Sequence, residues 1–148
     1  SINNELLLNI DFAPTLLDLA GINTPEDMQG ESFKNQLLNK EYKKRDAVYY
    51  HYYEYPFWHK VQPHYGVRTN RYKLIHYYYN MDEWELFDLT EDKNELNNLY
   101  GKEGFEEITN DLKVKITQLQ VKYKDDMSLD EMRKMTDTRI KRVYNSKK

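Results

Sequence analysis

The sequence contains no cysteine, so disulfide bonds, thiolate metal ligands and a cysteine nucleophile are excluded within its 148 residues. Glycine and proline are scarce, with five and four copies, which excludes a collagen-like chain or a long Pro/Gly-rich linker. No apolar run approaches the roughly 20 residues that a membrane-spanning helix requires. The first residues, SINNE, also lack the basic start and apolar stretch of a signal peptide. We therefore expect no transmembrane segment and no membrane partner.

Tyrosine and charged residues are plentiful instead. The chain holds 14 tyrosines and has a formal net charge of −3, but the charge is unevenly distributed. Residues 82–111 carry 11 acidic and two basic side chains, whereas residues 122–148 carry nine basic and five acidic ones. A nucleic-acid-binding domain usually places basic residues on the same face as its aromatic ones. Because an acidic stretch follows the tyrosine-rich middle, we expect no nucleic-acid partner and interpret the basic end as a solvated helix face.

The first 40 residues predict a short strand followed by a helix. The apolar run Leu6–Ile10 is typical of a strand, and the Asp11 carboxylate can accept hydrogen bonds from the free amides of a following helix. Pro14 is tolerated in a first helical turn, and Gly21 is a typical helix end. The polar residues 39–46 then predict a linker to a second unit.

Four segments rich in tyrosine and in alternating apolar residues predict strands: Ala47–Tyr55, His64–Thr69, Tyr72–Tyr79 and Trp84–Leu89. Asn70-Arg71 is short enough to close a tight hairpin. Apolar residues then recur every three or four positions over residues 105–123, which predicts an amphipathic helix. A second helix should begin at Ser128, with Glu131 completing a capping box. The fold class is therefore α+β, a four-stranded, mostly antiparallel sheet with a long amphipathic C-terminal helix packed on one face.

The sequence motifs of ordinary enzymes are absent. No G-x-S-x-G, P-loop, H-E-x-x-H or G-x-G-x-x-G string occurs. The run Asp88-x-Thr90-x-Asp92 begins like an EF-hand loop, but Lys93 stands where glycine is required and Leu99 where the bidentate glutamate should be. We therefore expect neither a catalytic residue nor a metal site in this chain.

A polar group near the first hairpin supplies the best candidates for ligand binding. Alternation along the strand at 64–69 places Tyr65 and Val67 on the helix-covered face, and His64 and Arg68 on the opposite, uncovered face. Histidine and the planar guanidinium group of arginine can both donate to sulfate, phosphate or carboxylate oxygens. His64 and Arg68 are therefore candidates for binding an anion on the uncovered face.

His51 and Glu54, in the preceding strand, are further candidates. Their H-x-x-E spacing puts them on opposite faces of a strand, so we do not expect them to share a metal ion. For His51, Glu54 and Arg68, packing or pairing within the sheet is the simpler interpretation. For His64, ligand contact and a structural role are equally well supported.

Several segments, in matching order and spacing, resemble the C-terminal portion of the type I, formylglycine-dependent sulfatases of the alkaline phosphatase superfamily. They are NIDFAPTLLDLAG (9–21), MQGESF (28–33), HYGVRT (64–69), RYKLI (71–75), WELFDL (84–89) and ELNNLY (95–100). The resemblance implies that residues 1–40 are a strand-helix remnant of the large α/β sulfatase domain. It further implies that residues 41–124 form the C-terminal subdomain and residues 125–148 a helical extension.

The same resemblance implies a parent enzyme that hydrolyses sulfate esters, on sulfated carbohydrates, with a formylglycine nucleophile and a calcium ion. The C/S-x-P-x-R motif that supplies formylglycine does not occur here, so we expect the chain alone to be inactive and to hold no cofactor. The implied partner is an upstream catalytic domain, and this segment would form one wall of its substrate cleft. His64 is the first candidate for binding substrate there, followed by Arg68, His51 and Glu54. Family members are commonly periplasmic or extracellular.

Two functions of other classes also fit these residues. The chain could be a stand-alone carbohydrate- or anion-binding module that uses its aromatic rings as stacking platforms. It could also be a structural or oligomerisation domain that associates through a tyrosine-rich sheet face.

Overall fold

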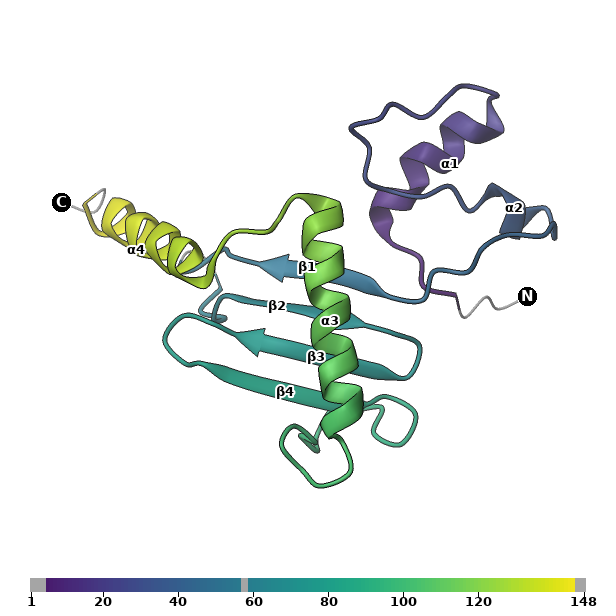
Figure 1. Ribbon diagram of the computed structural model, residues 1–148. Coiled ribbons are helices and arrows are strands. Elements are labelled where there is room, and N and C mark those ends of the chain that lie inside the picture. The colour runs from purple at the N-terminus through teal and green to yellow at the C-terminus, as the bar shows by residue number, and fades with distance from the viewer. Residues whose placement is uncertain (1–4, 57–58, 146–148) are drawn as a thin grey trace. The chain divides into compact units, whose positions relative to one another are not determined.

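The computed structural model describes residues 5–56 and 59–145. The chain divides into two compact units at the boundary between Asp46 and Ala47. Figure 1 shows short helices and loops in the first unit, and a sheet with two long helices in the second. Phe57 and Trp58, in the loop between the first two predicted strands, lie outside the described residues. The assignment of residues 1–40, 41–124 and 125–148 to three parts of a parent enzyme stays a prediction.

The first unit has little regular structure. Its elements are the 3-10 turn η1 (Asn9–Asp11) and the helices α1 (Phe12–Leu19) and α2 (Lys34–Leu37). The strand predicted over residues 6–10 is wrong, because the Asp11 amide donates to the Leu8 carbonyl at 3.0 Å and closes a tight turn there. The predicted helix that follows is confirmed.

Asp11 is fully buried and connects three segments of the first unit. Its carboxylate accepts two hydrogen bonds from the Arg45 guanidinium, at 2.7 and 2.8 Å. It also accepts one from the amide of Leu8 at 2.7 Å and one from that of Glu31 at 2.9 Å. Burial alone would raise the pKa of Asp11, but these hydrogen bonds outweigh burial and hold that pKa below its ordinary value. The expectation that this carboxylate caps α1 is therefore wrong, since its oxygens bind Arg45 and the two loop amides instead.

The second unit is built on a sheet whose strands lie in sequence order. They are β1 (Val48–Tyr52), β2 (His64–Arg68), β3 (Tyr72–Tyr77) and β4 (Glu83–Asp88). All four predicted strands are confirmed, and every pairing is antiparallel. The tight turn at Asn70-Arg71 is also confirmed, because the Thr69 amide donates to the Tyr72 carbonyl at 2.8 Å across it.

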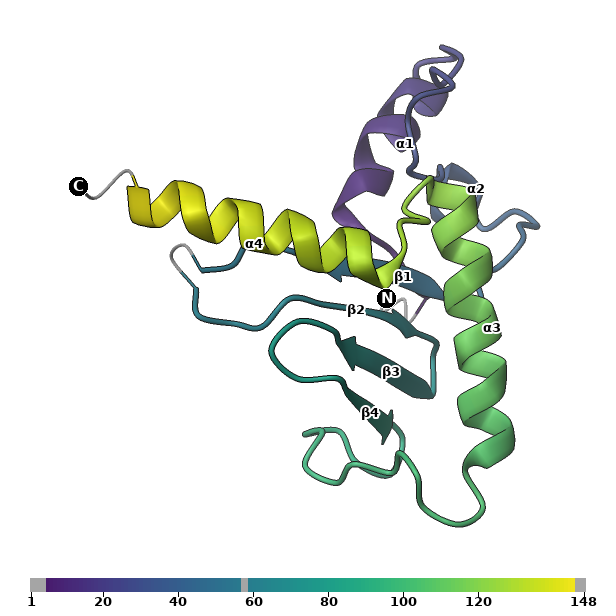
Figure 2. The same cartoon turned by 60° about the vertical axis from the view of Figure 1, so that its left-hand side comes forward.

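Two long helices follow the sheet, as predicted. Helix α3 (Glu106–Tyr123) crosses one face of the sheet, and α4 (Leu129–Asn145) extends beyond the end of β1 (Figure 1 and Figure 2). The predicted capping box at the start of α4 is present. The Glu131 carboxylate accepts from the Ser128 amide at 2.8 Å, and the Ser128 hydroxyl accepts from the Glu131 amide at 3.4 Å.

The core of the second unit lies between the two helices and the sheet face that carries Tyr65 and Val67. This is the face that alternation predicted to be covered. Its buried members come from all four strand regions and both helices, namely Ala47, Tyr65, Val67, Leu74, Tyr78, Leu86, Leu112, Ile116 and Met132. The α3 residues Leu112 and Ile116 belong to the apolar stripe that the sequence periodicity identified.

The opposite sheet face is more enclosed than the sequence suggested. Phe87 on this face is only 5% exposed. Lys73 forms an ion pair of 2.6 Å with Glu95, from the loop after β4. The Tyr50 side chain lies over Gly66, where a Cβ atom would fall 2.5 Å from the Tyr50 hydroxyl. The expectation of an uncovered face is therefore wrong for the middle of the sheet, because side chains of the sheet itself and the following loop cover it.

Acidification from about pH 7.5 to about pH 5.5 should destabilise the chain. Burial lowers the pKa of both His64 and His76 from the ordinary value of 6.5. Below pH 6.5 the unfolded chain therefore binds protons that the folded chain does not, and the free energy of unfolding falls as the pH drops toward the folded-state values. Urea denaturation at both pH values, followed by circular dichroism, measures this. Replacing both histidines with glutamine should remove most of the dependence, and equal stability of the original chain at both pH values would contradict it.

Candidate functional site

His64 lies at the start of β2, half-buried among tyrosine rings on the face opposite α3. Its ring centroid is 5.4 Å from that of Tyr52, 5.2 Å from Tyr77 and 6.0 Å from Tyr50. Nδ1–H donates to the Gln62 carbonyl at 2.8 Å, and within the described residues Nε2 has no hydrogen-bond partner. Because burial lowers the pKa of His64, the ring is neutral at pH 7 and Nε2 is an acceptor. In this state the geometry suits a ligand hydroxyl group, which donates, better than an anionic oxygen.

His51 lies on β1, on the helix-covered face of the sheet. Its Nδ1–H donates to the Asp125 carboxylate at 2.7 Å, and its Nε2 lies 2.8 Å from the Tyr78 hydroxyl. Asp125 also accepts from the Tyr49 hydroxyl at 2.7 Å. Both ring nitrogens of His51 are thus engaged, and only 6% of its side chain is exposed. His51 is therefore a fixed and largely enclosed part of the structure, and neither of its nitrogens is available to a ligand.

A cavity of about 490 Å³ opens just beyond β1 and is lined by His51, Tyr52, Tyr53, Glu54 and Arg139. It brings together two of the predicted site residues, His51 and Glu54. Tyr52 connects the cavity to a third, because it is one of the lining residues and its ring stacks on that of His64. Three of the four candidates therefore gather at one end of the sheet.

Arg68 is the candidate that stands apart. It is the last residue of β2 and pairs across the sheet with Val48 and Lys73, whereas His64 is the first residue of the same strand. At about 3.3 Å per residue, the two Cα atoms are roughly 13 Å apart along the strand. Arg68 is exposed. The substrate-binding roles of His64, Arg68, His51 and Glu54 stay predictions.

Arg139 completes the cavity from α4 and was not among the predicted residues. The interpretation of the basic C-terminal end as a solvated face is wrong for Arg133 and Arg139. Their guanidinium groups donate to the carbonyls of Tyr78 at 2.7 Å and of Tyr53 at 2.6 Å. These bonds hold α4 against the backbone at the end of the sheet.

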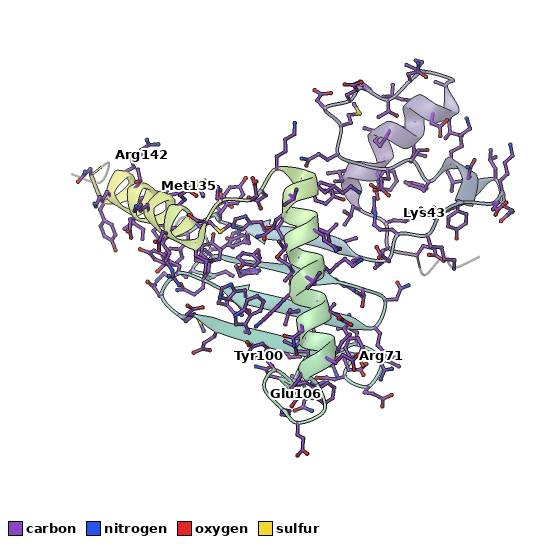
Figure 3. All side chains as sticks on the ribbon, in the orientation of Figure 1. Lys43, Arg71, Tyr100, Glu106, Met135 and Arg142 are labelled. Atoms are coloured by element: carbon purple, nitrogen blue, oxygen red, sulfur yellow. The ribbon has the colours of Figure 1, made fainter. Side chains whose placement is uncertain are left out.

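A signal for Arg139 was present in the sequence. It follows the buried residues Met132 and Thr136 at spacings of four and three, which places all three on one face of the helix. Figure 3 shows Met135, a neighbour in sequence of Thr136, on this helix. The stripe of apolar residues along α4 is short and interrupted by polar residues. Its periodicity therefore indicated a helix but not what the helix would contact.

The described residues do not supply a ligand set for a metal ion. In residues 5–56 and 59–145, no group of three or more His, Asp and Glu side chains is placed to hold one. These residues therefore do not fit the calcium ion that the family resemblance implies for the parent enzyme.

In the same part of the chain, no helix is both long and apolar enough to cross a membrane.

Comparison with protein families gives a match along most of the chain. Residues 1–122 match the family model described as N-sulphoglucosamine sulphohydrolase, C-terminal. Among curated proteins, an N-acetylglucosamine-6-O-sulfatase of Bacteroides thetaiotaomicron is 44% identical over 128 residues, covering 84% of this chain and 23% of that protein. Arylsulfatase K of Bos taurus is 30% identical over 122 residues, covering 74% of this chain and 21% of that protein.

Solved structures agree with these sequence matches. A protein solved in complex with its substrate D-glucosamine-2-N,6-O-disulfate is 46% identical, with a TM-score of 0.74 over 78% of this chain and 24% of that one. A putative sulfatase from Bacteroides thetaiotaomicron is 31% identical, with a TM-score of 0.68 over 78% of this chain and 25% of that one. The chain thus spans about a quarter of the length of these relatives.

Proposed function

The chain belongs to the N-sulphoglucosamine sulphohydrolase C-terminal family, and on that basis we propose that it is the C-terminal part of an enzyme that hydrolyses sulfate esters on sulfated carbohydrates. The observation that carries the proposal is the 44% identity, over most of the chain, to a protein named N-acetylglucosamine-6-O-sulfatase. The similar protein solved with a disulfated glucosamine supports the same class of substrate. We infer that a sulfated glucosamine is the sugar bound.

In this proposal the chain contributes to substrate recognition, and residues of an upstream catalytic domain break the sulfate ester bond. The sequence has no C/S-x-P-x-R motif, and the described residues do not fit a calcium ion. In the parent enzyme, formylglycine and calcium would supply the nucleophile and the positive charge for the cleavage. The end of the sheet at which the cavity lies, beyond β1, would form one wall of the substrate cleft.

His64 is the residue best suited to contact the sugar. Its Nδ1–H is held by the Gln62 carbonyl, so the neutral ring presents Nε2 as an acceptor for a sugar hydroxyl group. Tyr52 and Tyr77 fix the plane of the ring from two sides. Since the ring is already oriented before substrate arrives, little side-chain entropy is lost on binding.

The proposal can be tested with a chimeric enzyme. The C-terminal segment of the Bacteroides N-acetylglucosamine-6-O-sulfatase is replaced by residues 1–148 of this chain, so that α4 and its core residue Met132 are retained, and release of sulfate from N-acetylglucosamine-6-sulfate is measured. We expect hydrolysis by the chimera and none by the 148-residue chain alone. A folded chimera that carries its formylglycine but releases no sulfate would contradict the proposal.

In the same chimera, His64→Ala should lower kcat/KM by about tenfold or more, because one hydrogen bond to the sugar is lost. His64→Gln should retain part of the activity, since its amide oxygen can still accept a hydrogen bond. Val114→Ala, on the exposed side of α3 with Val114 57% exposed, is the matched control and should leave kcat/KM unchanged. Unaltered kinetics for His64→Ala would remove His64 from the site.

A further inference from the structure

Helix α4 lies beyond the part of the chain that matches the family, because that match ends at residue 122 and α4 begins at Leu129. The helix is nevertheless firmly packed. Met132 and Thr136 are buried, with exposures of 1% and 0%. The Tyr79 hydroxyl donates to the Asp137 carboxylate at 2.6 Å. The part of the cavity wall that α4 contributes is therefore held in place by buried side chains and hydrogen bonds.

The side chain that α4 places in the cavity is Arg139. Its Nη1 donates to the Tyr53 carbonyl at 2.6 Å, and its guanidinium carbon lies 4.6 Å from the centroid of the Tyr53 ring. Nη2 makes only a long contact of 3.7 Å with the Met135 sulfur. Within the described residues the Arg139 guanidinium contacts the Tyr53 carbonyl, the Met135 sulfur and the Tyr53 ring but no carboxylate, so most of its five N–H donors remain available to an anionic group.

The remaining walls suit a sugar ring. Tyr53, which is 48% exposed, offers a flat apolar ring, and the exposed Glu54 offers a carboxylate that can accept from hydroxyl groups. The volume of about 490 Å³ lies within the range of roughly 300–1,000 Å³ that small-molecule sites occupy. The cavity therefore combines a stacking surface with one cationic and one anionic group.

The cavity also lies next to His64. Tyr52 belongs to both places, since it is one of the residues that line the cavity and its ring stacks on His64 at 5.4 Å. In the register of β1 and β2, Tyr52 and His64 are directly opposite each other. His51 and His64 lie on opposite faces of the sheet, but both stand at the same end of it, and β1 is an edge strand. A carbohydrate chain whose sugar contacts His64 would therefore pass around the edge of β1 to bring its next sugar to the cavity.

We propose that the cavity of His51, Tyr52, Tyr53, Glu54 and Arg139 is a second saccharide subsite, which binds the neighbouring sugar of the glycan through a sulfate or carboxylate group held by Arg139. The inference rests on the proposed function for its substrate class. The Glu54 carboxylate accepts hydrogen bonds from hydroxyl groups of the same sugar, and the Tyr53 ring packs against the guanidinium group of Arg139. The subsite gives the protein a preference for glycans with an anionic group on the second sugar.

Calorimetric titration of the 148-residue chain with heparin-derived disaccharides tests the subsite. A disaccharide with a sulfate or carboxylate on each sugar should bind at least tenfold more tightly than one with a neutral second sugar. Arg139→Ala should abolish that difference, and Arg139→Lys should retain part of it, because the charge remains without the planar fork. Lys134→Ala removes an exposed charge from the same helix and should leave both affinities unchanged. Circular dichroism verifies that α4 is retained in each variant.

Two results would overturn the subsite. One is the absence of binding by the original chain at millimolar disaccharide, and the other is an Arg139→Ala variant that discriminates as well as the original chain. Neither depends on catalysis. Hydrolysis of the monosaccharide by the chimera, combined with either result, would leave the proposed function standing without the subsite. An inactive chimera, combined with Arg139-dependent binding, would support the subsite and count against the sulfatase assignment.

Discussion

Asp11→Ala should destabilise the first unit by about 3 kcal/mol, because Arg45 would lose its buried carboxylate partner and keep the Leu6 carbonyl at 3.1 Å and the more distant Glu31 carboxylate at 3.6 Å. Asp11 is 0% exposed, and the Arg45 side chain that it binds is only 11% exposed. The substitution would also remove the acceptor for the amides of Leu8 and Glu31. Hydrogen exchange at these two amides in the full chain measures the effect, and we expect their protection to be lost.

The matched control for this prediction is Asp18→Ala, on the neighbouring helix α1. Asp18 also pairs with a basic residue, Lys34, at 2.9 Å, but its side chain is 43% exposed. Solvent-exposed pairs contribute little to stability, so this variant should retain protection at both amides. Equal losses in the two variants would show that the burial of Asp11 has no special importance.

Tyr78→Ala should destabilise the second unit by about 3–5 kcal/mol, as expected when a large buried aromatic side chain is deleted. Tyr78 is 0% exposed and stacks on Tyr65 at a centroid distance of 5.7 Å. Its hydroxyl lies 2.8 Å from Nε2 of His51. The ring therefore fills the core under the cavity and fixes one of the cavity walls. Urea denaturation followed by circular dichroism measures the loss.

Tyr78→Phe separates the two roles. It keeps the ring but leaves Nε2 of His51 without its partner, which should cost about 1–3 kcal/mol. Tyr144→Ala removes a tyrosine that is 67% exposed and should change stability by less than about 0.5 kcal/mol. If Tyr78→Phe were as destabilising as Tyr78→Ala, the hydrogen bond rather than the volume of the ring would dominate.

The elements of the second unit were predictable because their signals are local. Alternating tyrosine and aliphatic residues define the strands, Asn70-Arg71 closes a hairpin between adjacent strands, and the stripe of residues 105–123 needs only a period of 3.6. The division of β2 into a Val67 face and a His64 face follows from the same alternation. Each of these features depends on residues a few positions apart.

The contacts that shape the candidate site were not predictable, because they join distant segments. His51 binds Asp125 across 74 residues, and Arg139 binds the Tyr53 carbonyl across 86. No sequence pattern within β1 distinguishes a histidine held by an aspartate from one that contacts a ligand. The strand predicted over residues 6–10 was wrong for a similar reason, since Asp11 turns inward to an arginine 34 positions later.

The order of the strands also has a consequence for how the second unit assembles. Each strand pairs with the one before it, and β2, β3 and β4 are joined by short connections, so their ladders can form by closing small loops at low entropic cost. Contacts between β1 and the two helices must wait for segments made much later, and such non-local contacts slow folding. During synthesis the antiparallel ladders of β2, β3 and β4 can therefore form before the helices are made. The cavity is completed only when the last helix, α4, has been made.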